Sequence, residues 1–280
     1  MAIKGASLLL LFNLVINAEM LREPFPIGYG MSNLGTILWS NGYSARQSWI
    51  PAAVSDSSLK KGLDIAVVSY YDEMDNLQDR YLYQLICGGF LTTRYIYFKT
   101  SFSYFDAFNT YFEQSFFFSV ALSLVPSLNV SLEGTAYRVG LSGIDCEVHT
   151  IGEMGLSAWF EMHFVAISLQ CKNLIVKKSE VDGLEPQLSV TCGIHTPSSR
   201  FGAQGVAAEI TPHQSNPLRW KIGEEVKVLR WLAIEVGIAN NPVQVAMGLS
   251  IDFQRPSVTV ALVNQPQLGW SKGVYLGYSR

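Results

Sequence analysis

The run SFFFSVALSLVPSLNVSLEGT at residues 115–135 decides the fold class of this 280-residue chain. Before Pro126, large apolar side chains occupy every second position from Phe116 to Leu124, and most of the positions between them are small or polar. After Pro126-Ser127 the same alternation resumes and continues to Thr135. Successive side chains of a β-strand point to opposite faces of the sheet, so a period of two indicates strands. The run therefore predicts a β-hairpin with one apolar and one polar face.

The same alternation recurs along the chain. Its clearest further examples are residues 154–164, 187–195, 243–253, 258–262 and 274–278, and weaker ones are residues 62–71, 81–87, 90–103, 205–211, 219–228 and 230–238. The alternation changes phase near Val165, which predicts a bulge or bend there. Turn signals such as Asn240-Asn241-Pro242 separate several of these segments. We expect 12 to 14 antiparallel strands.

The polar face distinguishes two all-β architectures. A soluble sandwich buries its apolar face and needs a charged outer face, whereas a transmembrane β-barrel turns its apolar face to lipid and lines its lumen with polar and small residues. Only 15% of this chain is charged, against about 25% in an average soluble domain. We therefore predict a transmembrane antiparallel β-barrel, with a soluble secreted β-sandwich that acts as a binding module as the alternative. The charged or ionisable candidates for the lumen lining are Glu133, Glu161, His163, His195 and Asp252.

Composition excludes other classes of protein. Hydrophobic residues make up 49% of the chain, which is too many for a disordered protein. The net charge is −3, and no basic stripe is present that would neutralise the phosphates of a nucleic acid. After the first 20 residues no run of 18 apolar residues occurs, which argues against a helical membrane protein.

The N-terminus has the pattern of a secretory signal peptide. Lys4 precedes the apolar run LLLLFNLVI at residues 8–16, and Ala18 ends a plausible cleavage site. The other interpretation of this run is a buried N-terminal helix. We expect a signal peptide at 1–18, an N-terminal segment at 19–61 and the barrel at 62–280. The segment at 19–61 lacks a strand pattern, so it either lies on the periplasmic side or folds into the lumen as a plug.

Export places the cysteines in an oxidising compartment. Cys87, Cys146, Cys171 and Cys192 either form disulfides or act as four unpaired small apolar residues. No cysteine pair has CxxC spacing, and no Cys/His cluster suits zinc, so we expect neither a metal nor a cofactor. Asn129-Val130-Ser131 matches a glycosylation sequon, but it lies inside a strand pattern and we discount it.

The C-terminal end resembles a known group of barrels. Residues 230–253 read RWLAIEVGIANNPVQVAMGLSIDF, and residues 258–278 read VTVALVNQPQLGWSKGVYLGY. These runs resemble the closing strands of outer-membrane barrels in the long-chain fatty-acid transporter superfamily, which includes the barrel of the type IX secretion system. The matching positions are Arg230, Gly237-Ile238, Pro242, Gly248, Pro266, Leu268-Gly269, Ser271 and Tyr278.

Three features depart from that group's pattern. Gln265 and Lys272 stand where histidines are usual. Residues 48–52 (SWIPA) resemble the N-terminal motif "WNPA", with Ile50 in place of asparagine. The chain ends in Ser279-Arg280 rather than a terminal aromatic residue, so Tyr278 is the candidate for that role. The resemblance implies an N-terminal segment packed inside the barrel and passage of hydrophobic molecules. No ligand motif matches, so it assigns no ligand residues.

Two motifs allow a catalytic interpretation. His213-Gln214-Ser215-Asn216 resembles the H-x-S-N element of outer-membrane phospholipases and lipid A deacylases, in which the histidine is the base for a nucleophilic serine. Pro212 and Pro217 bracket it, which favours a plain polar turn. Glu161 and His163 are two residues apart on the polar face, so they form an acid–base pair, a site on the substrate pathway or a hydrogen-bonded lumen network. We expect no enzyme.

The sequence therefore predicts a protein of the bacterial outer membrane. We expect a porin-like passage or transport barrel or a membrane scaffold. The alternatives are a component of an outer-membrane secretion or assembly complex and an acyl hydrolase that uses His213 and Ser215. The expected partners are the lipid bilayer, a hydrophobic small-molecule ligand and a periplasmic or outer-membrane protein, and not nucleic acid.

Overall fold

A computed structural model describes the chain. It describes residues 61–70, 82–93, 95–107, 111–141, 149–162, 165–177, 186–199, 202–211, 218–229, 231–240, 243–253, 256–265 and 269–279. The predicted signal peptide at 1–18 and the predicted N-terminal segment at 19–61, apart from its last residue Lys61, lie outside the described residues. Within the described ranges, no helix has the length and apolar character that a membrane-spanning helix needs.

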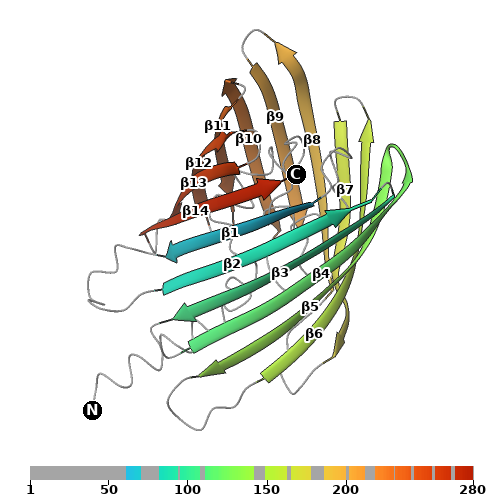
Figure 1. The fold of residues 1–280 in the computed structure, drawn as a ribbon, viewed down its shortest axis with the longest axis vertical. Coiled ribbons are helices and arrows are strands. Elements are labelled where there is room, and N and C mark those ends of the chain that lie inside the picture. Colours follow the sequence, from blue (N-terminus) through green and yellow to red (C-terminus); the bar gives the residue numbers. More distant parts are fainter. Residues whose placement is uncertain are drawn as a thin grey trace.

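Fourteen strands make up the described elements (Figure 1). They are β1 (Lys61–Tyr70), β2 (Leu82–Thr92), β3 (Ile96–Ala107), β4 (Tyr111–Val125), β5 (Leu128–Leu141), β6 (His149–Met162), β7 (Val165–Lys177), β8 (Gln187–Ser199), β9 (Gly202–Thr211), β10 (Arg219–Leu229), β11 (Leu232–Ala239), β12 (Gln244–Asp252), β13 (Pro256–Gln265) and β14 (Gly269–Ser279).

The strands form one closed antiparallel sheet. Each strand pairs with its neighbours in sequence, and β14 closes the barrel by pairing with β1, for example at Ile65 and Leu276. In Figure 1 the last strand, in red, lies beside the first, in blue. The prediction of an all-β antiparallel barrel of 12 to 14 strands is confirmed, whereas the alternative of a sandwich of two stacked sheets is wrong.

The decisive run forms the predicted hairpin. β4 ends at Val125, a turn follows, and β5 begins at Leu128. Phe116 is 49% exposed, whereas Ser119, three residues further along β4 and on the other face, is 1% exposed. Leu132 is exposed and Glu133 is buried in the same way on β5. The barrel thus turns apolar side chains outward and polar side chains inward, the reverse of a soluble domain.

The two rims of the barrel differ in the length of their connections. At one rim, which we name the short-turn rim, neighbouring strands are joined by two or three residues, as between β4 and β5. At the other, the long-loop rim, connections have three to eleven residues, the longest between β1 and β2. β1 begins and β14 ends at the short-turn rim.

Two details of the predicted strands differ in the structure. The phase change near Val165, predicted as a bulge or bend, is the chain reversal of a hairpin, because β6 ends at Met162, β7 begins at Val165, and these two residues pair. The predicted strand at 90–103 is divided between β2, which runs to Thr92, and β3, which begins at Ile96. At Val165 the chain reversal is visible in the sequence only as the change of phase, and the connection of three residues between β2 and β3 is too short to interrupt the apolar pattern visibly.

Phenylalanine–glycine pairs fill gaps between strands. Phe118 on β4 is paired with Gly134 on β5, and its ring lies where a glycine Cβ would project, 2.5 Å from that position. Phe112 covers Gly140 in the same way on the same pair of strands. Aromatic rings over cross-strand glycines help to fix the register of a sheet.

Candidate functional site: the inner wall of the barrel

The inner wall is built from alternate residues of every strand, and one part of it carries a charged network. Gln170 on β7 donates hydrogen bonds from Nε2 to both carboxylate oxygens of Glu133 on β5, each at 3.1 Å. Lys99 on β3 and Lys172 on β7 also interact electrostatically with Glu133, and Lys99 does so with Asp64 on β1. The network therefore links four strands that are not direct neighbours.

A glycine on the strand between them leaves the space that the contact between Glu133 and Gln170 needs. Gly155 on β6 pairs directly with Glu133, and the register between β6 and β7 shifts at this point, between Met154 and Leu156. A Cβ on Gly155 would lie 2.6 Å from Oε1 of Glu133 and 2.7 Å from the backbone oxygen of Cys171. The side chain of Glu133 therefore occupies the space that any other residue at position 155 would need.

Hydroxyl groups extend this network along β5 and β6. The hydroxyls of Ser131 and Ser157 lie 2.5 Å apart, and both serines are buried. Tyr137 donates its hydroxyl to Oε1 of Glu153 at 2.6 Å. Buried polar groups are costly unless they are hydrogen-bonded, so these pairs stabilise the polar part of the inner wall.

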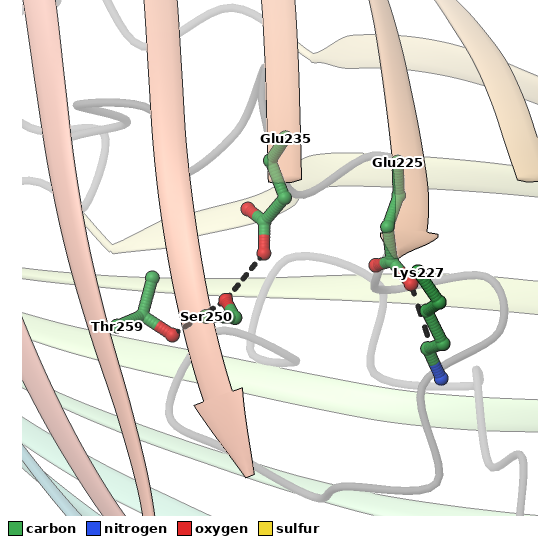
Figure 2. A network of polar contacts seen from close by, with 5 residues as sticks. All are labelled: Glu225, Lys227, Glu235, Ser250 and Thr259. Atoms are coloured by element: carbon green, nitrogen blue, oxygen red, sulfur yellow. Dashed lines mark hydrogen bonds and ion pairs between the residues drawn. The ribbon is translucent and has the colours of Figure 1, made fainter. Parts of the chain in front are cut away.

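A second network lies on β10 to β13 (Figure 2). Ser250 donates its hydroxyl to Oε1 of Glu235 at 2.6 Å, and the hydroxyls of Ser250 and Thr259 are 2.7 Å apart. Ser250 has one proton, which goes to the carboxylate, so Thr259 is the donor to Ser250. Glu235 is 0% exposed and pairs across the sheet with Glu225, which is also buried. The ammonium of Lys227 lies 3.9 Å from Oε1 of Glu225 and offsets part of the repulsion between these two carboxylates.

A further part of the inner wall carries small and apolar side chains between its polar ones. Val68 on β1, Gly273 on β14 and Ala261 on β13 occupy directly paired positions, and all are buried. Neighbouring pairs extend this surface, which we name the small apolar strip: it consists of Ala66, Val68, Ile86, Ala246, Ala261, Val263 and Gly273. The inner wall is therefore polar on β3 to β7 and on β10 to β11, whereas from β12 through β14 to β2 the small apolar strip alternates with buried polar residues such as Asp64, Gln244 and Thr259.

Two of the predicted lumen residues can be placed with their side chains. Glu133 is buried at the centre of the first network. Glu161, near the end of β6, is half-buried, and Nε1 of Trp159 donates to its Oε2 at 3.4 Å. The structure does not bring these two carboxylates into one hydrogen-bonded pair.

The other predicted residues lie wholly or partly outside the described part of the chain. His195 lies on β8 opposite Gly205, and Asp252 lies on β12 opposite Ser257, but their side chains are not among those described. His163, between β6 and β7, lies outside the described residues. So do His213 and Ser215, between β9 and β10, and the hydrolase interpretation stays untested.

The sequence interpretation missed several members of the wall, including Lys99, Glu153 and Gln170. Lys99 follows the same rule as Glu133, because it alternates with the exposed residues Phe98 and Phe102. Gln170 lies on β7, whose alternation was not recognised. A search for polar residues at the inward positions of all strands would have found them.

The described cysteines are not disulfide-bonded. Cys87, Cys171 and Cys192 are free, and Cys87 and Cys192 are exposed on β2 and β8. Cys192 alternates with the buried residues Thr191 and Gly193, so it shares the outward face with Val190 and Ile194. Cys146 lies outside the described residues. Within the described ranges, no group of three or more His, Cys, Asp or Glu residues is arranged to hold a metal ion.

Comparison with known proteins identifies the fold. Neither a protein-family model nor a curated protein matches the sequence. Among solved structures, the outer-membrane protein Omp33 of Acinetobacter baumannii matches with a TM-score of 0.54 and 9% sequence identity, covering 79% of this chain and 99% of Omp33. A deletion mutant of TodX, described as a monoaromatic hydrocarbon channel, matches with a TM-score of 0.58 and 7% identity, covering 82% of this chain and 92% of the TodX chain. At this level of identity the likeness concerns the fold alone, which is that of an outer-membrane β-barrel.

Proposed function

We propose that the protein is a barrel of the bacterial outer membrane that carries small, largely apolar solutes. The observation that carries this proposal is the inverted polarity of a closed barrel: its outward face is apolar, and its inner wall combines buried polar networks with a small apolar strip. A predominantly apolar outward face suits lipid and not water. The apolar class of solute is taken from the resemblance of the C-terminal strands to the fatty-acid transporter superfamily, which implies passage of hydrophobic molecules.

The lengths of the connections support one orientation. Outer-membrane barrels have short turns on the periplasmic side and longer loops outside. The short-turn rim, where β1 begins and β14 ends, then faces the periplasm, and the long-loop rim faces outward. After cleavage of the signal peptide at 1–18, the N-terminal segment predicted at 19–61 would join the barrel from the periplasmic side.

The burial of the inner wall supports our proposal that the N-terminal segment predicted at 19–61 is a plug. The side chains of Ala121 and Ala261 point inward and are 0% exposed, so other groups cover them completely on the lumen side. In a barrel with an open, water-filled lumen, such residues would be accessible to water. We therefore infer that this N-terminal segment occupies the lumen and that solute passes between it and the small apolar strip.

The test begins with the barrel itself. Extracted protein is run unheated and heated on an SDS gel, and a band that migrates more slowly after heating identifies a closed barrel. The purified barrel is then reconstituted into vesicles, and uptake of a small apolar solute is measured. Ala261→Trp should reduce uptake because it fills the small apolar strip. Val260→Trp is the matched control, because Val260 is adjacent on β13 and faces outward.

The outcomes separate the parts of the proposal. A heat-shifted protein whose uptake equals that of empty vesicles would contradict transport and leave the barrel. Equal uptake by wild-type and Ala261→Trp would contradict passage along the strip. Deleting residues 19–60 should raise uptake if they fill the lumen, and an unchanged rate would contradict the plug.

A second candidate function is a membrane scaffold in a secretion or assembly complex. The observation in its favour is the complete burial of so much of the inner wall, because a scaffold needs no passage. This candidate predicts no uptake by the wild-type barrel and a stable complex with a periplasmic or outer-membrane protein, detected by crosslinking in intact cells.

A further inference from the structure

The outward face of β2 to β5 changes character close to the long-loop rim. Cys87, Phe102, Phe116 and Ala136 form a row of directly paired positions across these four strands. One row nearer the long-loop rim, the paired positions are Leu85, Tyr104, Gln114 and Arg138. The apolar band therefore gives way to polar groups within two residues on each of β3, β4 and β5.

The aromatic member of this polar row is held in place. The hydroxyl of Tyr104 donates to Oδ2 of Asp106 at 3.1 Å, and its ring lies against Tyr83, with 6.2 Å between the ring centroids. Tyrosine rings concentrate where a bilayer meets water, since one end of the ring is apolar and the other polar. The pair thus marks the level at which the hydrocarbon ends on this side of the barrel.

Arg138 is the unusual member of the row. Its side chain is exposed on the outward face, and neither it nor the adjacent Gln114 forms a side-chain hydrogen bond or ion pair with any other described residue. The guanidinium of arginine stays charged and presents a fork of N–H donors that matches a phosphate in a bidentate manner. The carboxylate of Asp106, the acidic group on the same face, is buried and already accepts the Tyr104 hydroxyl.

We propose that Arg138, with Gln114 beside it, binds the phosphate of a lipid headgroup in the outer leaflet. A lipid fits better than free phosphate because Phe102 and Phe116 are exposed in the row directly beneath, where acyl chains would contact them. Gln114 supplies an additional N–H donor from its side-chain amide. Tyr104, in the same row, lies at the level of the bilayer interface, where the headgroup would be. This inference rests on the proposed function, since it requires that the long-loop rim face outward in a bilayer.

The test uses the full-length barrel in phosphatidylcholine nanodiscs with and without diphosphoryl lipid A. Lipid A retained per barrel is counted by mass spectrometry after purification, and the heat shift on SDS gels verifies folding. Arg138→Gln should lower the affinity for lipid A about tenfold, as expected for the loss of charge-assisted hydrogen bonds. Arg138→Lys should fall between wild type and Arg138→Gln, because it keeps the charge and loses the fork.

Lys61→Gln is the matched control. Lys61 is also an exposed, outward-facing cation, but it lies at the short-turn rim, at the start of β1. Its loss should leave the binding of lipid A unchanged. The inference is overturned if Arg138→Gln retains as much lipid A as wild type, or if Lys61→Gln loses as much as Arg138→Gln.

Free phosphate is distinguished in a separate arm. Inorganic phosphate alone, added to barrels in phosphatidylcholine nanodiscs, should not change the temperature at which the barrel unfolds and its gel mobility falls. Lipid A should raise this temperature. If both raise the unfolding temperature equally, Arg138 binds phosphate in general, and the assignment of a lipid headgroup is contradicted. A chain that does not form a heat-shifted barrel in plain phosphatidylcholine would instead contradict the proposed function, and both proposals would fall.

Discussion

Gln170 reaches Glu133 across an intervening strand: its amide donates to both carboxylate oxygens at 3.1 Å, although β6 lies between β7 and β5. Direct cross-strand pairs join neighbouring strands, and this contact joins second neighbours. It needs a gap in the wall, which Gly155 provides. The charged wall on β3 to β7 is thus fixed by one position that carries no side chain.

Gly155→Ala should destabilise the barrel by about 1–3 kcal/mol, as overpacking does in well-packed sites. The added Cβ would lie 2.7 Å from the backbone oxygen of Cys171, so part of the clash falls on backbone that cannot move aside easily. The urea midpoint of unfolding in detergent micelles, followed by tryptophan fluorescence, measures the change.

Gly152→Ala is the control for this prediction. Gly152 lies on the same strand, β6, and a Cβ there would meet nothing within 4 Å. It should leave the urea midpoint nearly unchanged. Equal effects of the two substitutions would mean that the Glu133–Gln170 contact does not depend on the gap at position 155.

The outward and inward faces of the hairpin at β4 and β5 could be predicted from the sequence because the alternation is unbroken there. Glu133 was found in this way, as an inward position among Ser131 and Thr135. The partner of Glu133 could not be found, because Gln170 is 37 residues away and the contact depends on the shift of register between β6 and β7. Local alternation identifies a face, and only the packing of three strands identifies the contact.

The buried chain Glu235–Ser250–Thr259 predicts an unequal response to two substitutions. Ser250→Ala removes the donor to a fully buried carboxylate, and we expect a cost of about 1–3 kcal/mol. Thr259→Val removes the donor to a neutral hydroxyl and keeps the side-chain shape, so we expect a cost of about 1 kcal/mol or less. Urea unfolding measures both, and a larger cost for Thr259→Val would contradict the assigned direction of the hydrogen bonds.

The free cysteines predict a labelling pattern. Cys87 and Cys192 are exposed on the apolar outward face, so a lipid-soluble maleimide should label them in intact membranes. A charged, membrane-impermeant maleimide should not, and both reagents should react after the protein is unfolded in SDS. Variants with alanine at one of the two positions assign the label. Rapid reaction with the charged reagent in intact membranes would mean that this face contacts water.

The apolar outward face predicts that the cost of an added charge depends on how far the charge lies from the rims. Leu132 lies midway between the outward positions Leu128 and Ala136 on β5 and is 43% exposed. An arginine at the middle of a lipid-facing band costs about 2–4 kcal/mol, against about 0–1 kcal/mol near the interface. Leu132→Arg should therefore lower the free energy of folding into phospholipid vesicles far more than Tyr278→Arg, since Tyr278 is outward-facing but lies at the short-turn rim. Urea titration of folding into vesicles measures both. Because the two substitutions introduce the same charge on the same face, equal costs would mean that the band between the rims does not contact hydrocarbon, and the membrane interpretation would fail at its central observation.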